Sequence, residues 1–154
     1  MTTNDDLAQR AWVAMRTLVL DQYDRRFAVS EAIGMSYLRA KALRLLGAGP
    51  MPMRDLGAAL VTDAPYVTVI VDDLEQRGLV RREVNPADRR SKLVHVTDAG
   101  RKIAAEADRI QSAPPPPLAD LDEETLVALE QTLRTLVSGT SAAPAPRTPP
   151  AQPR

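Results

Sequence analysis

Cysteine is absent from this chain of 154 residues, and histidine occurs only once. The missing thiols exclude disulfides, thiol-based redox sensing and zinc sites with cysteine ligands. Aromatic residues make up only 3% of the sequence. No apolar run approaches the roughly 20 residues that a membrane-spanning helix needs, and the polar, acidic start, MTTNDDLAQR, is unlike a signal peptide. The composition indicates a cytoplasmic protein with no membrane partner.

Net charge is also absent, because 20 Lys and Arg residues balance 20 Asp and Glu residues. That balance disfavours a general coat for nucleic acid. The charge is nevertheless segregated along the chain. Residues 79–102 hold seven basic and three acidic side chains, a balance of +4, whereas residues 103–138 hold two and seven, a balance of −5. A basic arm is therefore followed by an acidic segment.

Catalytic patterns are missing as well. The sequence contains no nucleophile paired with a base, no cluster with metal-ligand spacing and no Gly-rich phosphate loop. We therefore expect neither an enzyme nor a bound cofactor or metal.

Apolar residues recur at helical spacing in several segments. The first segment predicts one long helix over residues 5–28, with Asn4 as its cap. A second helix is expected after Ser36 and is stopped by a Gly and Pro cluster that ends at Pro50. A third, short helix is expected over residues 53–60.

A fourth helix should follow a short break, with Asp63 as its N-cap and Pro65 in its first turn, where proline is tolerated. Apolar residues at i, i+3, i+4 and i+7 predict a buried stripe along this helix: Val67, Ile70, Val71 and Leu74. Gly78 should end it.

A basic hairpin is predicted next, between residues 79–84 and 92–97, both of which have strand character. Asn85 and Pro86 form a strong chain-reversal signal between them. Four charged residues lie at or near the turn: Asp88, Arg89, Arg90 and Lys92. Such a turn can reach a phosphate backbone.

The remaining chain predicts two more helices. One begins near Thr97 or Asp98 and must end before the run Pro114–Pro117, which is a stiff spacer. The other covers residues 122–137 and carries leucines along one side. Residues 138–154 are rich in Pro, Ala, Ser and Thr and are expected to form a flexible, disordered tail.

The order of short helix, break, longer helix and hairpin is that of a winged helix-turn-helix, in which the second helix of the pair enters a major groove. The fold class is therefore mainly α with a small β-hairpin wing. Tyr66, Thr68 and Val69 lie on the exposed side of the second helix. None of them is a bidentate base reader, so DNA shape should carry much of the specificity.

A different interpretation fits the same pattern. Helix pairs are common in all-α domains, and exposed hairpins collect Arg and Lys for solubility. The alternative is a winged-helix protein-interaction module that binds no operator. The absence of an arginine at position 69 favours that alternative.

The residues from Leu56 through NPADRRSKLVHVTDAG resemble the MarR family of bacterial transcriptional regulators. The resemblance rests on the wing signature D-x-R followed by V-x-L-T-x-x-G, in which Val96 replaces the leucine. Helices on both sides are similar in order and length, so the resemblance covers about residues 7–137.

The resemblance implies a role for individual residues. Arg90 occupies the position of the arginine that enters the minor groove, and Asp88 that of the acid that holds this arginine by a charge-assisted bond. Arg89 and Lys92 are similar to phosphate-contacting residues, as are Ser36 and Arg54. Tyr66, Thr68 and Val69 correspond to major-groove readers, although an arginine is common where Val69 stands. Val61 replaces a glycine of the turn, and we expect that change to matter little.

The resemblance also implies a homodimer that binds double-stranded DNA. A single unit of residues 1–137 would dimerise through helices over about residues 5–28 and 98–137, around a winged domain of residues 36–97. Two-fold symmetry requires a pseudo-palindromic operator with half-sites about 10 bp apart. Whether the protein represses or activates transcription is left open, although a repressor released by a small molecule is typical of the family.

A small phenolic or aromatic acid is the effector class that the resemblance implies. Five residues offer aromatic walls and a partner for a carboxylate: Trp12, Arg16, Tyr23, Tyr37 and Arg39. Core packing is the alternative role for these side chains. His95 is expected to be solvated or to face phosphate rather than to act as a pH switch or metal ligand.

Overall fold

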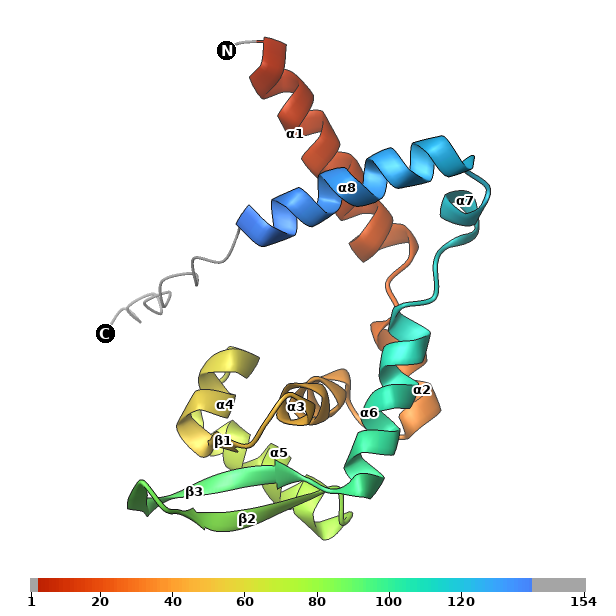
Figure 1. The fold of residues 1–154 in the computed structure, drawn as a ribbon. Coiled ribbons are helices and arrows are strands. Elements are labelled where there is room, and N and C mark those ends of the chain that lie inside the picture. Colours follow the sequence, from red (N-terminus) through yellow and green to blue (C-terminus); the bar gives the residue numbers. More distant parts are fainter. Residues whose placement is uncertain (1–2, 140–154) are drawn as a thin grey trace, which may run out of the picture. The chain divides into compact units, whose positions relative to one another are not determined.

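The protein was analysed as a computed structural model that describes residues 3–139 (Figure 1). Its contacts divide the chain into two compact units, Met1–Ala113 and Pro114–Arg154. The boundary falls at the start of the proline run, where missing backbone N–H groups prevent continued helix. No helix within residues 3–139 is long and apolar enough to cross a membrane. Most of the predicted tail, residues 138–154, lies outside the described residues.

The amino-terminal part of the first unit is interrupted rather than continuous. Helix α1 (Thr3–Arg16) passes into a π-helical segment, η1 (Thr17–Gln22), and a separate helix α2 follows (Arg26–Ile33). The prediction of one helix over residues 5–28 is therefore wrong. The carboxylate of Asp24 accepts the backbone N–H of Arg26 at 2.9 Å, and this local bond competes with a continuous helical ladder. Asn4 lies inside α1 and is not its cap.

The helix pair follows its local sequence signals. Helices α3 (Tyr37–Gly47), α4 (Met53–Leu60) and α5 (Ala64–Gln76) confirm the second, third and fourth predicted helices. The carboxylate of Asp63 accepts the backbone N–H of Tyr66 at 2.8 Å, which satisfies an otherwise free donor of the first turn of α5.

The turn between α4 and α5 contains the single non-glycine residue with positive φ in the described chain. Val61 has φ 56° and ψ 50°, which is the left-handed conformation, and its side chain is exposed. A β-branched residue is strained there because its Cβ crowds the following carbonyl. The turn therefore closes without the glycine, as expected, but it does so with Val61 in a strained conformation.

A small antiparallel sheet completes the winged domain. Strands β2 (Val80–Asn85) and β3 (Asp88–Val96) form the predicted hairpin, and β1 (Met51–Pro52) pairs with the other side of β3. The sequence did not predict β1, because its only signal is its pairing with Leu93 and Val94 far along the chain. Strand β3 also begins earlier than expected, so the turn consists of Pro86 and Ala87.

One hydrophobic core unites α3, α4, α5 and the hairpin. The predicted stripe of α5 is confirmed, since Val67, Ile70, Val71 and Leu74 are all buried. Helices α4 and α5 approach closely at Gly57, where an added Cβ would lie 2.9 Å from a methyl group of Val67. This packing fixes α5 against α4, and the buried stripe determines which side of α5 faces outward.

Helix α6 (Asp98–Gln111) closes the first unit. Its Gly100 packs so tightly against the residue that precedes β2 that a Cβ there would lie 2.1 Å from the carbonyl oxygen of Leu79. A smaller buried cluster of Val29, Ala40 and Ala107 joins α6 to α2 and α3.

The second unit contains a short helix, α7 (Pro116–Ala119), and a long one, α8 (Glu123–Gly139). The carboxylate of Asp122 accepts the backbone N–H and the hydroxyl of Thr125, both at 2.9 Å, and so caps α8. An apolar groove runs along α8 between Leu118 and Val137. Neither helix buries a residue within the part of the chain that is described.

Candidate nucleic-acid interface

The outward side of α5 presents the three residues predicted to read bases. Tyr66 and Val69 have exposed fractions of 42% and 52%, and Thr68 is also exposed. The hydroxyl of Thr68 donates to the carbonyl of Ala64 at 3.1 Å. Its lone pairs and methyl group remain available, so Thr68 can accept from an amino group of a base or contact a thymine methyl.

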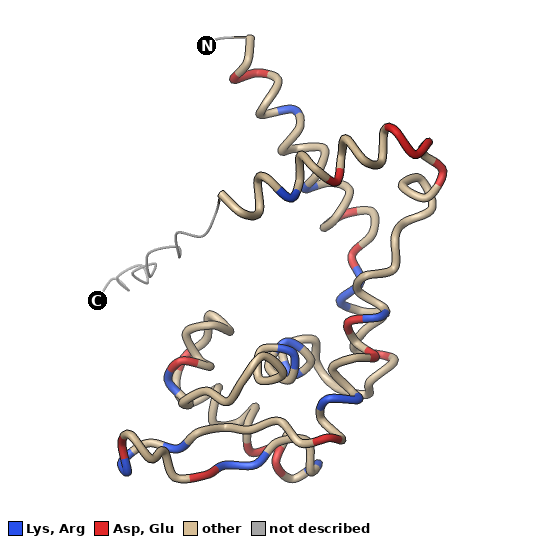
Figure 2. The backbone as a smooth tube through the Cα atoms, viewed as in Figure 1, with Lys and Arg blue, Asp and Glu red and all other residues tan. Residues whose placement is uncertain are grey.

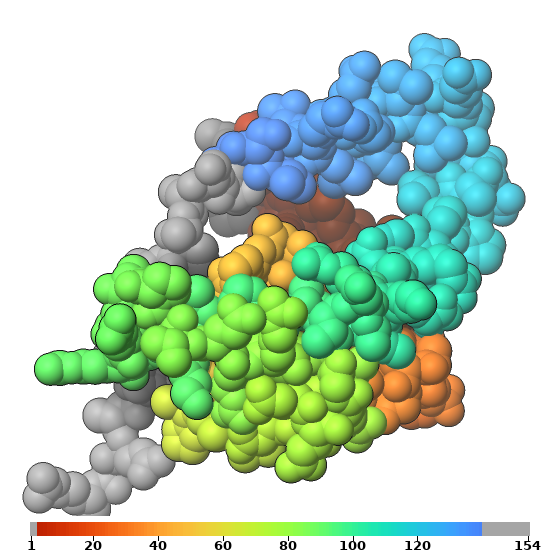
Figure 3. Space-filling view, turned by 60° about the horizontal axis from the view of Figure 1, so that its bottom comes forward, coloured from red at the N-terminus to blue at the C-terminus, as the bar shows by residue number. Residues whose placement is uncertain are grey.

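The wing turn projects from the body of the winged domain (Figure 3). Arg89, Arg90 and Lys92 are all exposed there. None of the three forms an ion pair with another residue in the range 3–139. On β2, basic residues Arg81 and Arg82 lie next to acidic Glu83 (Figure 2). The turn therefore presents three cations whose charge is not neutralised by a neighbouring carboxylate.

Asp88 contacts Arg90 differently from the expectation. Its carboxylate accepts the backbone N–H of Arg90 at 3.0 Å, and within the described chain it forms no ion pair with the guanidinium. The spacing of two residues favours this Asx-type bond to the main chain. Asp88 thus shapes the turn and leaves the guanidinium of Arg90 free.

Two turn residues were not identified from the sequence. The side-chain amide of Asn85 donates to the hydroxyl of Ser91 at 3.1 Å, and its carbonyl oxygen accepts the backbone N–H of Ala87 at 3.0 Å. The hydroxyl of Ser91 in turn donates to the carbonyl of Asp88 at 3.1 Å. Asn85 had been interpreted only as a chain-reversal signal, although Asn commonly makes such bonds in turns.

The predicted backbone contacts lie on two helices. The side chain of Arg54 is 92% exposed at the start of α4, and Asp55 lies 3.4 Å away. Ser36 precedes α3, but its hydroxyl accepts from the guanidinium of Arg39 at 3.0 Å instead of capping the helix. Of the two, only Arg54 is a cation, and its side chain is largely exposed.

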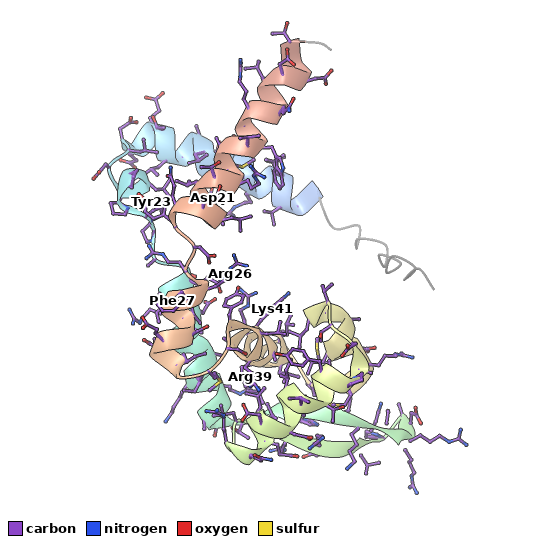
Figure 4. The ribbon with its side chains drawn as sticks, turned by 180° about the vertical axis from the view of Figure 1, so that it is seen from behind. Asp21, Tyr23, Arg26, Phe27, Arg39 and Lys41 are labelled. Carbon is purple, nitrogen blue, oxygen red and sulfur yellow. The ribbon has the colours of Figure 1, made fainter. Side chains whose placement is uncertain are left out.

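The five residues predicted to form an effector pocket do not share a cavity in the described chain. Trp12 and Arg16 lie on α1, Tyr23 follows η1, and Tyr37 and Arg39 lie on α3. Figure 4 shows Tyr23 and Arg39 on separate elements, with Arg26 and Phe27 of α2 between them in the view. The effector site stays a prediction.

Two of these side chains have partners on other helices. The amide of Gln111 donates to the hydroxyl of Tyr37 at 2.6 Å. The guanidinium of Arg39 donates to the carboxylate of Asp73 on α5 at 2.6 Å, with 19% of its side chain exposed. Burial raises the pKa of Asp73, but hydrogen bonds from Arg39 and Arg77 outweigh this and hold the pKa below its usual value.

His95 is covered, contrary to the expectation of a solvated or phosphate-facing side chain. Only 23% of its side chain is exposed, and its Nε2 atom lies 3.3 Å from a carboxylate oxygen of Glu83 without a hydrogen bond. The side chain points away from the core, as the alternation of β3 requires. It is nevertheless screened because it lines a polar hollow of about 350 Å³ with Leu46, Pro50 and Arg101.

No group of three or more potential metal ligands occurs within residues 3–139. The candidate site is a set of exposed side chains on two elements, α5 and the wing. Such a set suits the recognition of an extended anionic surface.

Comparisons with known proteins agree with this geometry. A model described as MarR family matches residues 33–91. The chain is 38% identical over 52 residues to the uncharacterized HTH-type transcriptional regulator YkoM of Bacillus subtilis, covering 34% of each protein. The chain spans between about a third and a half of the length of the curated relatives it matches. These relatives are transcriptional regulators and not enzymes.

Solved structures extend the similarity to most of the chain. Sco5413, a MarR family transcriptional regulator from Streptomyces coelicolor, is 27% identical with a TM-score of 0.57, and 94% of this chain and 100% of Sco5413 are covered. Sco3205 from the same organism, solved in complex with DNA, is 23% identical with a TM-score of 0.56 and a coverage of 93% and 91%. The predicted winged-helix fold is confirmed.

Proposed function

We propose that this chain, which is similar to the MarR family over residues 33–91 and to Sco5413 over most of its length, is a homodimeric, sequence-specific DNA-binding regulator of that family. The observation that carries the proposal is the group of free cations on the wing, Arg89, Arg90 and Lys92, next to the exposed side of α5. Phosphate contacts supply most of the affinity of such proteins, and contacts in the grooves supply specificity.

In this proposal α5 lies in a major groove. Tyr66 and Thr68 contact base edges or phosphate, and the exposed methyl groups of Val69 contact a thymine methyl. Since none of these side chains forms a bidentate bond with guanine, the helix discriminates weakly among base pairs. A greater share of the specificity then falls on the shape of the DNA.

The wing supplies the second contact. The guanidinium of Arg90 enters the minor groove, whose negative potential is strongest where the groove is narrow. Asp88 supports this role through the backbone of the turn. Arg89, Lys92 and Arg54 contact phosphates, with Ser36 a further contact from the start of α3.

Dimerisation is supported by apolar side chains that the described chain leaves exposed. On α1 and η1 these include Leu7, Trp12, Val13, Val19 and Leu20, and on α8 they include Val127 and Leu133. Apolar surface of this kind marks interaction sites. We propose that a second copy covers it, so that two winged domains read the half-sites of a pseudo-palindromic operator.

Regulation by a small molecule is the last element of the proposal. The protein would act as a repressor, and a phenolic or aromatic acid would release it from the operator. Trp12, Arg16 and Tyr23 offer an aromatic wall and a cation for such a ligand, with Tyr37 and Arg39 on α3 as further candidates. The support for this element is the similarity to the MarR family together with these residue types.

Selection of duplexes from a random library by the full chain tests the proposed function. The expected result is enrichment of a pseudo-palindrome with half-sites about 10 bp apart, and binding that weakens steeply as salt rises. If no duplex is retained even at low salt, operator binding is excluded. The winged domain would then be a protein-interaction module, which the absence of an arginine at position 69 favours.

A further inference from the structure

One arginine joins the wing to the recognition helix. The guanidinium of Arg82 on β2 donates to the carboxylate of Glu75 at 2.6 Å and 3.0 Å, and to the carboxylate of Asp72 at 2.6 Å. The other oxygen of Glu75 accepts the backbone N–H of Arg82 at 3.0 Å. Both acids belong to α5, so side-chain and main-chain atoms of β2 are fastened to the same helix.

Within the described chain, these are the last hydrogen bonds between β2 and α5 before the wing turn. Side chains alternate along a strand, so Val80, Arg82 and Val84 point to one face. Val80 is buried in the core, Arg82 is 23% exposed, and Val84 is already 58% exposed. Hydrophobic packing therefore holds the base of the hairpin but does not extend beyond Arg82.

The position of Arg82 gives it leverage over the wing turn. Three residue steps of strand lead from Arg82 to Asn85, where β2 ends, which at about 3.4 Å per residue corresponds to about 10 Å. A rotation of about 10° at Arg82 would displace the start of the turn by about 2 Å, which is enough to break a hydrogen bond. We call the contact of Arg82 with Asp72 and Glu75 the clamp. A small rotation of β2 at the clamp thus becomes a larger displacement of Arg90.

Without Arg82, the two carboxylates of α5 that it contacts would repel each other. Asp72 and Glu75 are one helical turn apart and repel each other unless a cation lies between them. The hydrogen bond from Arg82 holds the pKa of Glu75 below its usual value, so that this carboxylate stays ionised beside Asp72. Both acids are partly exposed, and the clamp keeps their charge from facing a polyanion unpaired.

We propose that Arg82 is a positioning residue that fixes the angle between the recognition helix and the wing, so that α5 and Arg90 engage adjacent grooves at once. The inference rests on the proposed function. Arg82 itself is not assigned a contact with DNA, because its guanidinium is occupied by two carboxylates. Its effect passes through the position of Arg90.

Arg81 provides a matched control. It precedes Arg82 on the same strand, carries the same charge and points to the opposite face. Its guanidinium donates to Glu83 at 2.8 Å, two residues along the same strand, so the pair joins nothing to α5. Arg81→Gln and Arg82→Gln therefore remove the same charge, and only the second removes the clamp.

The first test needs no DNA. Because the chain has no cysteine, spin labels can be placed at Gln76→Cys on α5 and Ala87→Cys in the wing turn of the full chain. Dilution with an excess of unlabelled cysteine-free protein leaves the distance within one copy as the one that is measured. We expect a narrow distance distribution for the labelled parent and for Arg81→Gln, and a broader one for Arg82→Gln. Arg82→Lys should be intermediate, since one ammonium cannot bridge both acids as a guanidinium does. An unchanged distribution in Arg82→Gln overturns the clamp.

The second test measures coupling in binding to the duplex selected by the parent protein. Arg82→Gln should weaken binding about tenfold and Arg81→Gln less than about threefold, with melting temperatures compared for both. The fold-loss caused by Arg90→Ala should shrink in the Arg82→Gln background, because an unpositioned Arg90 has less to lose. Multiplicative losses for the two substitutions overturn the inference.

The outcomes separate the two proposals. A parent protein that binds no duplex overturns the proposed function, whereas an unchanged spin-label distance overturns the clamp whatever the DNA result. If Arg82→Gln does not fold, Glu75→Gln carries the same tests, since it removes the two-point contact while keeping a hydrogen-bonding amide. A loss of binding with an unbroadened distance distribution in Glu75→Gln contradicts a positioning role.

Discussion

Helices α3 and α5 each bury four side chains, whereas α1, η1 and α8 bury none within the described residues. The first group belongs to what we call the winged core, α2 to α6 with the sheet. We call α1, η1 and α8 the flanking helices. Isolated helices gain little stability without a packed apolar face. The apolar side chains of the winged core thus bury one another, whereas those of the flanking helices need another surface to cover them.

The largest expected effect lies in the winged core. Ile70 is fully buried on α5, and Ile70→Ala should lower the free energy of unfolding by about 2 to 5 kcal/mol through lost transfer energy and a cavity. Leu133→Ala on α8 should lower the free energy of unfolding far less when the protein is dilute enough to be monomeric. Urea unfolding of both variants measures the difference. Equal losses would mean that the flanking helices are packed as tightly as the core.

A charge on a flanking helix should separate self-association from folding. Leu20 on η1 is 50% exposed, so Leu20→Glu should leave the winged core stable. If a second copy covers Leu20, the buried carboxylate should weaken dimerisation by roughly 2 to 4 kcal/mol. Sedimentation over a range of concentrations measures this, with Asp21→Asn on the same segment as control. A dimer of unchanged affinity would place the interface elsewhere.

The wing turn belongs to the winged core but supports none of its packing. Arg90→Ala should therefore weaken binding to the selected duplex by about 1 to 3 kcal/mol and leave the melting temperature unchanged. Arg109→Ala removes the same charge from α6, where the guanidinium is paired with Glu106 at 2.7 Å, and should have a much smaller effect. Fluorescence anisotropy at fixed salt compares the two. Equal losses of affinity in the two variants would mean that Arg90 contributes only through its charge and not through its position.

The sequence predicted the winged core better than its surroundings because its signals are local. Asp63, Pro65 and the stripe of α5 all lie within one helix, and the hairpin shows its own alternation. The break at Asp24 was missed because the apolar spacing continues through it. Strand β1 and the partners of Arg82 were missed for another reason, since both depend on pairings between distant segments.

The same distinction applies to the interface. Residue types at the wing turn and on α5 correctly identified side chains that are exposed, including the cations Arg89, Arg90 and Lys92. The sequence could not show that Asp88 bonds to the backbone of Arg90, or that Leu46 and Pro50 lie beside His95. The first depends on the hydrogen-bond geometry of the turn, and the second depends on contacts between residues that are distant in the sequence.

The winged core also contains a strained position that can be relieved. Val61 has φ 56° and is 86% exposed, so its side chain gains little packing in return for the strain. Val61→Gly should raise the free energy of unfolding by about 1 kcal/mol, because glycine adopts this conformation without a steric penalty. Gly78, at φ 71°, is the reverse control: Gly78→Ala should destabilise by a similar amount. A destabilised Val61→Gly would show that Val61 makes a packing contribution larger than its strain.

Acid should weaken the winged core through the carboxylates that hold α5. Glu75 and Asp73 have folded-state pKa values below their usual 4.5 and 3.8, so their stabilisation is complete above these values. It is lost as the pH falls through the depressed folded values, when protons bind and the ion pairs with Arg82 and Arg39 break. The free energy of unfolding should therefore be nearly constant from pH 7 to about 5 and fall below about pH 4.5. Arg82→Gln should flatten that fall, because Glu75 then titrates nearer its ordinary pKa in both states. A decline that begins between pH 7 and 5 would contradict the assignment of this stabilisation to Glu75 and Asp73.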